Sequence, residues 1–245
     1  KKDYVLREYS TESCGNLYAY ILERNNQLLR MVNGRTGMIV PHSGFCTDRM
    51  APLLKVFEKG RLWVTTFCIR PAKLFNGVDQ RLAIYFLHRG ICEGKISSNY
   101  HHWHEEYRPY LFQNITWESL SNCSYKNSVP KLQNSLEVRI WKKMHSNKSL
   151  AAALHGDAKL YYHNAPRYWI RGMTFTPYFW NQRDGEQLST QVKTLRVGTQ
   201  AKASVVAALL NSNLFFWWFV ALSDCRYLNT REIELFPLDL FMIDS

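Results

Sequence analysis

Six large apolar side chains in a row, LFFWWF at 214–219, must be removed from water, and this requirement constrains the fold first. Polar residues flank the run at 211–213 and 223–224, and they leave fewer than the roughly 18 apolar residues that a membrane span needs. A helix that is apolar nearly all round is a buried helix. The sequence therefore predicts one long helix over 201–224 in a protein core, with both tryptophans packed there and no membrane partner.

The charge of the chain points to the class of partner. Lys and Arg number 31 against 20 Asp and Glu, which gives a formal net charge of +11 over 245 residues. Such an excess favours polyanionic partners, nucleic acid above all, and says nothing about the fold. With 46% hydrophobic residues the chain is globular rather than disordered, and it has room for one large domain or two small ones.

The cysteines bear on the cellular compartment. Six are scattered along the chain with no CxxC pair, and the opening Lys1–Lys2–Asp3 leads into polar sequence rather than a signal peptide. Reduced thiols and a cytoplasmic location are expected.

Alternating helix and strand patterns over 16–89 indicate the end of an α/β layered domain. A helix is expected over 16–31, stopped by Gly34 in a left-handed conformation. The apolar run TGMIVP is expected to form a strand covered on both faces, as in a parallel sheet. A second helix over 48–60 and the strands RLWVTTFCI and QRLAIYFLHR complete this part.

The remaining sequence is richer in polar and aromatic residues. SLEVRIWKKMHS has a helical pattern, whereas KLYYHNA and YWIRGMTF have strand patterns. The change in composition predicts two domains, 1–95 and 96–245.

Two groups of residues are weighed as metal sites. The HHWHEE run at 101–106 holds possible ligands, but its first two histidines point apart on a helix or a strand, so a polar loop is the preferred interpretation. Asp79, Glu93 and Lys95 follow the D…ExK order of metal-dependent nucleases, a short and common pattern. A nuclease stays an alternative, and no metal is expected. The sequence contains no nucleophile elbow, P-loop or dinucleotide fingerprint, so it shows no self-contained active site.

Residues 16–89 resemble the C-terminal half of the catalytic domain of TaqI-like N6-adenine DNA methyltransferases of restriction–modification systems. The matching pieces are NLYAYILER, GRTGMIVPHS, MAPLLKVF and KLFNGVDQRLAIYF. The segment AALLNSNLFFWWF…SDCRYLNTREIELFPL resembles the end of the family's target-recognition region.

This resemblance implies an α/β fold, namely the C-terminal part of a Rossmann-like methyltransferase domain (1–95) followed by an α+β target-recognition domain (96–245). The activity implied is methyl transfer from S-adenosylmethionine to adenine N6 in double-stranded DNA, with the target base flipped out of the stack. The family's Gly-rich cofactor loop and NPPY-type tetrapeptide precede the NLY helix and are absent here. Cofactor-binding and catalytic residues are therefore expected in an upstream half of the same catalytic domain, and this fragment alone is expected to be inactive.

Within the fragment, the resemblance places Phe75 where an aromatic ring stacks on the flipped adenine. The polar edge at 211–213 is expected to approach DNA. Candidate DNA-binding residues are Arg70, Lys73, Arg81, Arg167, Arg171, Lys193 and Arg196. Two further alternatives stay open: a non-catalytic DNA-specificity module of a restriction–modification system, and a protein-interaction fragment whose basic residues only solvate its surface.

Overall fold

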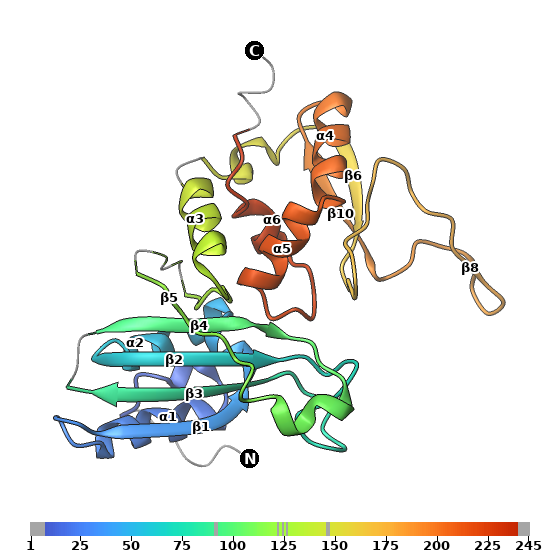
Figure 1. The fold of residues 1–245 in the computed structure, drawn as a ribbon. Coiled ribbons are helices and arrows are strands. Elements are labelled where there is room, and N and C mark those ends of the chain that lie inside the picture. Colours follow the sequence, from blue (N-terminus) through green and yellow to red (C-terminus); the bar gives the residue numbers. More distant parts are fainter. Residues whose placement is uncertain are drawn as a thin grey trace. The chain divides into compact units, whose positions relative to one another are not determined.

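The computed structural model describes residues 8–90, 93–121, 123, 125, 127–145 and 148–239. It divides into two compact units, 1–141 and 142–245 (Figure 1). The helices are α1 (Leu17–Leu28), α2 (Ala51–Val56), α3 (Ser135–Met144), α4 (Gln200–Leu210), α5 (Asn213–Leu222) and α6 (Thr230–Glu234). The strands are β1 (Arg35–Pro41), β2 (Gly60–Phe67), β3 (Leu82–Arg89), β4 (Gly94–His101), β5 (Glu118–Ser119), β6 (Ala158–His163), β7 (Gly172–Met173), β8 (Trp180–Asn181), β9 (Gly185–Glu186) and β10 (Val192–Val197).

The first unit is an α/β structure built on a mixed sheet of strand order β1-β3-β2-β4-β5. Strands β1 and β2 both run antiparallel to β3 and are therefore parallel to each other, while β4 pairs parallel with β2. Helices α1 and α2 lie together on one face of this sheet (Figure 1). There the rings of Phe45 and Phe57 pack on buried Tyr85, with centroids 5.9 and 5.1 Å away.

Strand β1 corrects the prediction for TGMIVP. It pairs with β3 on one side and, among the described strands, with none on the other, so it is an antiparallel edge strand. Its residues alternate, with Ile39 43% exposed and Val40 3% exposed. A short continuous apolar run does not reveal whether both faces are covered. The left-handed residue after α1 is also not Gly34 but Asn33, with φ of 58°.

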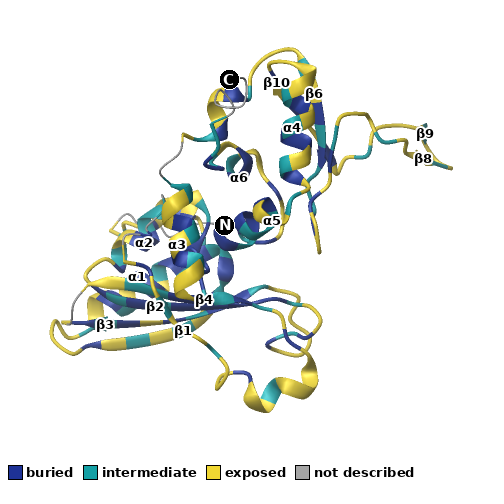
Figure 2. Cartoon of the chain, turned by 45° about the horizontal axis from the view of Figure 1, so that its top comes forward, coloured by how far each residue is buried: buried dark blue, intermediate teal, exposed yellow. Residues whose placement is uncertain are grey.

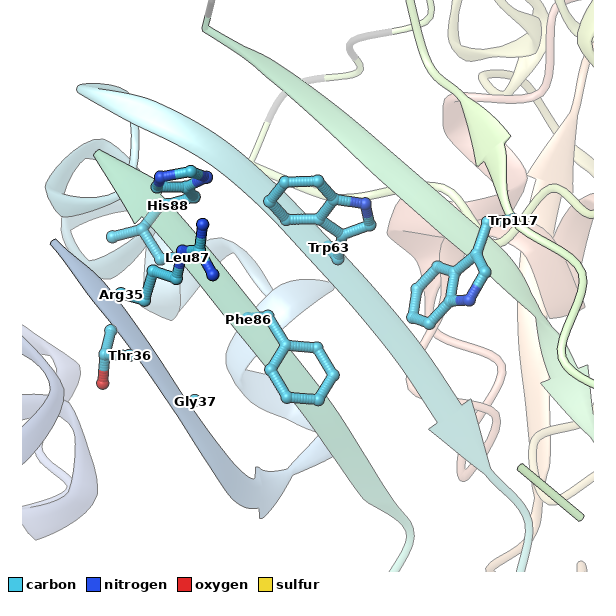
Figure 3. A pocket seen from close by; sticks show the side chains of 8 residues that line it. All are labelled: Arg35, Thr36, Gly37, Trp63, Phe86, Leu87, His88 and Trp117. Carbon is cyan, nitrogen blue, oxygen red and sulfur yellow. The ribbon is translucent and has the colours of Figure 1, made fainter. Parts of the chain in front are cut away.

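The sheet face opposite the helices is open over β1, β3 and β2. A hollow of about 690 Å³ lies there, with the rings of Trp63, Phe86 and Trp117 around it (Figure 3). Gly37 faces Phe86 across the strand pair, and a Cβ at Gly37 would lie 2.7 Å from the Phe86 ring. The glycine therefore lets the ring lie flat over β1, and the unit presents both a free strand edge and an apolar face.

The second unit has a three-stranded sheet of order β10-β6-β7, which packs against α4. The predicted single helix over 201–224 is wrong, because α4 and α5 meet at an angle of 67°. The Ser212 hydroxyl caps α5 by accepting from the Phe215 N–H (3.1 Å). Ser and Asn compete with the helical backbone in this way, so a break at 211–212 is physically reasonable.

The core placement of the aromatic run is confirmed for half of its residues, whereas Leu214 is 46% exposed and Phe216 and Trp217 are half-buried. Phe215, Trp218 and Phe219 are buried, and the Trp218 indole N–H donates to the Glu232 carbonyl (2.9 Å). Among the described residues, no single helix is long and apolar enough to cross a membrane, and α4 with α5 passes that test only as a bent pair.

The predicted boundary at 95/96 falls inside β4, which pairs with β2 along its length. The two compact units instead divide at 141/142. The polar composition of β4 concealed its place in the sheet. Two other segments are shorter than expected: the helix of 48–60 is a 3-10 turn followed by the six residues of α2, and YWIRGMTF contributes only β7.

Candidate nucleic-acid interface

The loop 68–81 joins β2 to β3 and lies at the end of the sheet where the parallel strands β1, β2 and β4 finish. Ligands of open α/β sheets bind outside the carboxyl ends of the parallel strands. The loop rests on a small apolar cluster of its own. The buried members are Phe67, Ala72, Leu74, Leu82, Trp103 and Leu111.

Arg108 holds this loop from behind. Its guanidinium donates to the carbonyls of Lys73 (2.8 Å) and Leu74 (3.0 Å), and it lies 4.7 Å from the centroid of the Trp103 ring. The Trp103 carbonyl in turn accepts from the Ala72 N–H (3.1 Å). Backbone groups of the loop are thus fixed from a neighbouring segment, so the loop has a defined shape without any ligand.

Phe75 stands at the tip of this braced loop. It is 46% exposed, whereas its neighbour Leu74 is 7% exposed. An ordinary core role for Phe75 is therefore excluded. A large aromatic ring is presented to solvent on an ordered turn, where the Val78 N–H donates to the Phe75 carbonyl (3.3 Å).

A group of polar rings lies beside the loop, at the same carboxyl end of the parallel strands. Tyr100 stacks on His42 (centroids 5.7 Å apart), meets His102 edge-on (5.0 Å), and its hydroxyl accepts from Arg81 Nε (3.0 Å). Burial, together with the charges of Lys131 and Arg81, holds the pKa of His42 well below its usual value. His42 is therefore a neutral ring at neutral pH.

Cys68 belongs to the same group. Burial raises the pKa of its thiol, but hydrogen bonds with the His102 and Tyr100 side chains outweigh burial and lower that pKa to about 7. The pKa of His102 is raised correspondingly, chiefly by its hydrogen bond with Cys68. The site therefore holds a thiol that ionises more readily than an ordinary cysteine.

The predicted basic residues of the first unit gather around the loop. Arg70 is exposed, and its carbonyl lies 3.2 Å from His102 Nδ1. Lys73 forms an ion pair with exposed Asp79 (2.5 Å), and the Arg81 guanidinium is held by Tyr100. All three residues thus lie near Phe75 in sequence and at the same end of the sheet.

The predicted basic residues of the second unit do not form one group. Arg167 and Arg171 lie in the β6–β7 loop and line the same hollow of about 450 Å³. Lys193 and Arg196 lie on β10 with an even register against β6, so their side chains leave opposite faces of the sheet. These two residues cannot share a flat binding surface.

The polar edge at 211–213 also has a structural role. The Asn211 amide donates to the carbonyls of Gly172 (2.9 Å) and Ala207 (2.9 Å), and its oxygen accepts from the Gly172 N–H (3.0 Å). Together with the Ser212 cap, these bonds tie α4, α5 and β7 together.

The two metal interpretations find no supporting geometry. Gly94 pairs with Arg61 at the start of β2, so Glu93 lies at that end of the strand. Asp79 follows the other end of β2, and the two carboxylates are therefore separated by the length of the strand, roughly 25 Å. The residues that the structure describes contain no group of three or more His, Cys, Asp or Glu placed to hold a metal ion. A nuclease built on Asp79, Glu93 and Lys95 is not supported.

Several residues of the site were not predicted from the sequence. His42 follows the end of β1, and Tyr100 and His102 alternate along the end of β4. That alternation, within the segment YHH, is a weak signal that a strand ends there. The sequence shows only the local partner of Arg108, Glu105 three residues earlier, and not the backbone carbonyls 34 and 35 residues away that it also binds.

No protein-family model matches the sequence, and no curated protein matches it significantly.

Proposed function

We propose that this chain is part of an adenine-specific DNA methyltransferase, which transfers a methyl group from S-adenosylmethionine to adenine N6 in duplex DNA. In this proposal the first unit completes the catalytic domain and the second unit recognises the DNA target. The observation that carries the proposal is the presentation of Phe75, an exposed aromatic ring on a braced loop at the carboxyl ends of the parallel strands.

An enzyme that modifies a base must first take it out of the helical stack, at a cost of a few kcal/mol. A ring that stacks on the extruded base contributes ~1–3 kcal/mol and offsets much of that cost. The contribution is larger when the ring is already in position, since no ordering is required on binding. The bonds from Arg108 to the loop supply that order.

The charges around Phe75 fit a polyanionic ligand. Arg70 and Lys73 precede Phe75 in the loop, and Arg81 ends the loop. Lys73 is paired with Asp79, so Arg70 and Arg81 carry most of the uncompensated charge. Contacts of this kind with phosphates fix a protein on the duplex without reading its sequence. The Tyr100 hydroxyl orients the Arg81 guanidinium, and the His42 N–H donates to the Arg81 carbonyl (3.0 Å).

The open edge of β1 gives the upstream half of the domain a place to pair. A strand added there would continue the sheet, and elements lying over Trp63 and Phe86 would cover the apolar face in Figure 3. We assign S-adenosylmethionine and the catalytic residues to that upstream half and none of them to this chain.

Reading the gene in frame upstream of the Lys1 codon tests the proposal. A Gly-rich loop after a strand pattern, followed by an NPPY-type tetrapeptide, is expected. An upstream sequence without both features would refute the catalytic assignment and leave the non-catalytic DNA-specificity module.

A further inference from the structure

The β6–β7 loop of the second unit encloses a hollow of about 450 Å³. The loop is closed by the His163 N–H, which donates to the Arg171 carbonyl (3.0 Å), and by the Asn164 N–H, which donates to the Gln191 carbonyl (2.8 Å). Pro166 and Ile170 are buried beneath it, so the side chains between them point outward. The volume is within the range of small-molecule pockets.

The walls of this hollow are aromatic and basic. Tyr168 and Trp169 are 67% and 61% exposed, and their ring planes are 32° apart. Arg167 and Arg171 are exposed on the same wall. None of the described lining residues is acidic, so the hollow favours a ligand that has a flat ring and a negative charge.

Two polar lining residues of the hollow, His163 and Gln191, can form hydrogen bonds with the edge of a base. The Ala165 N–H donates to His163 Nδ1 (3.3 Å), so in the neutral imidazole the proton lies on Nε2. Burial, followed by the charge of Arg171, lowers the pKa of His163, which keeps the ring neutral. The Gln191 amide, which hydrogen-bonds to His163, offers both a donor and an acceptor.

We propose that this hollow binds one unstacked nucleotide, with its base on the Trp169 ring and its phosphate between Arg167 and Arg171. The inference rests on the proposed function, because DNA supplies the nucleotide. It adds a second base-binding position, in the recognition unit, for a nucleotide displaced from the duplex.

The test compares two fluorescein-labelled duplexes of the same mixed sequence, one fully paired and one with a single unpaired adenosine, by fluorescence anisotropy with the whole chain. Stacking of one base corresponds to a factor of roughly 5 to 150 in affinity, so the bulged duplex is expected to bind tighter by that factor. Both duplexes are measured in a Phe75→Ala background, which removes the stacking proposed for the target adenine, and there the Trp169→Ala variant is expected to lose this preference. Phe175→Ala is the matched control, since Phe175 is 65% exposed and lies outside the hollow.

The arginines are tested by salt dependence. Arg167→Gln with Arg171→Gln removes the contacts to one phosphate and is expected to reduce the slope of log affinity against log salt by about 0.9. Arg183→Gln is the control, because Arg183 lies on the exposed β8–β9 arm outside the hollow (Figure 2), and it should leave the bulge preference unchanged. An unchanged slope in the double variant would overturn the placement of the phosphate.

Further outcomes separate the two proposals. Equal affinity for both duplexes, or an equal loss on both in Trp169→Ala, would overturn the nucleotide site while leaving DNA binding intact. Failure to bind either duplex would count against the proposed function itself. If the chain binds adenosine monophosphate in a Trp169-dependent way but shows no bulge preference, the hollow takes a free nucleotide instead of one from DNA.

Discussion

Asn211→Ala should destabilise the second unit, although Asn211 lies on the surface and its sequence context predicted a DNA-facing edge. Its side chain makes three hydrogen bonds, two with the backbone of Gly172 and one with Ala207. Gly172 is buried against Leu210, where an added Cβ would lie 3.0 Å from the Leu210 Cβ. Removing the amide therefore leaves backbone groups of a closely packed strand without partners.

The size of the effect follows from these bonds. A neutral hydrogen bond contributes ~1 kcal/mol net, so three give about 3 kcal/mol. Asn211 itself is exposed, and water can replace part of what is lost, which reduces the expected loss to about 2 kcal/mol. For a domain of about 100 residues this lowers the melting temperature by about 8–16 °C.

Differential scanning calorimetry of the whole chain measures the shift. Asn213→Ala is the matched control, because this exposed residue lies two positions along the chain at the first turn of α5, and it should change stability by less than about 0.5 kcal/mol. Equal melting temperatures for the two variants would refute the structural role of Asn211.

Two further predictions concern ionisation. Hydrogen bonds lower the pKa of Cys68 to about 7, so alkylation of this thiol by iodoacetamide should increase as the pH rises through neutrality. His102→Asn should move that increase to higher pH, because the hydrogen bond from His102 to the thiolate is lost. Mass spectrometry of the Cys68 peptide measures the extent of alkylation, and an unshifted pH profile in the variant would contradict the prediction. Glu23, on α1, accepts four hydrogen bonds from Ser10 and Thr11, which outweigh burial and lower its pKa below 4.5. The Glu23 carboxylate therefore stabilises the fold above pH 4.5 and loses this contribution as the pH falls through its folded-state pKa. In urea unfolding, the free energy of unfolding of Glu23→Gln should fall less steeply with acid than that of the wild type. Identical dependence of the unfolding free energy on pH in the two proteins would argue against this role.

The strands and helices of the first unit were largely predictable, because period and length identify α1, β2 and β3 directly. The position of β1 at the sheet edge was not predictable. Its neighbours are decided by pairing with β3, far along the chain, and the local sequence carries no record of that pairing. The polar strand β4 was missed for a related reason, since Ser97 and Ser98 are buried through hydrogen bonds and not through apolar side chains.

The candidate site was partly predictable. The resemblance selected Phe75, and composition selected the basic residues near it. The exposure of Phe75 depends on Leu74 and Trp103 filling the cluster beneath it, which only the folded chain shows. The sequence also did not show that Lys193 and Arg196 lie on opposite faces of a sheet, because this placement follows from the pairing of β10 with β6.

Methyl transfer by the complete gene product tests the central claim most directly. Incubation with S-adenosylmethionine and genomic DNA, followed by nucleoside mass spectrometry, should yield N6-methyladenine. Phe75→Ala should reduce kcat/KM by about 5- to 150-fold, Phe75→Trp should retain most activity, and exposed Phe175→Ala should retain all of it. The absence of N6-methyladenine, or full activity in Phe75→Ala, would contradict the role assigned to this ring.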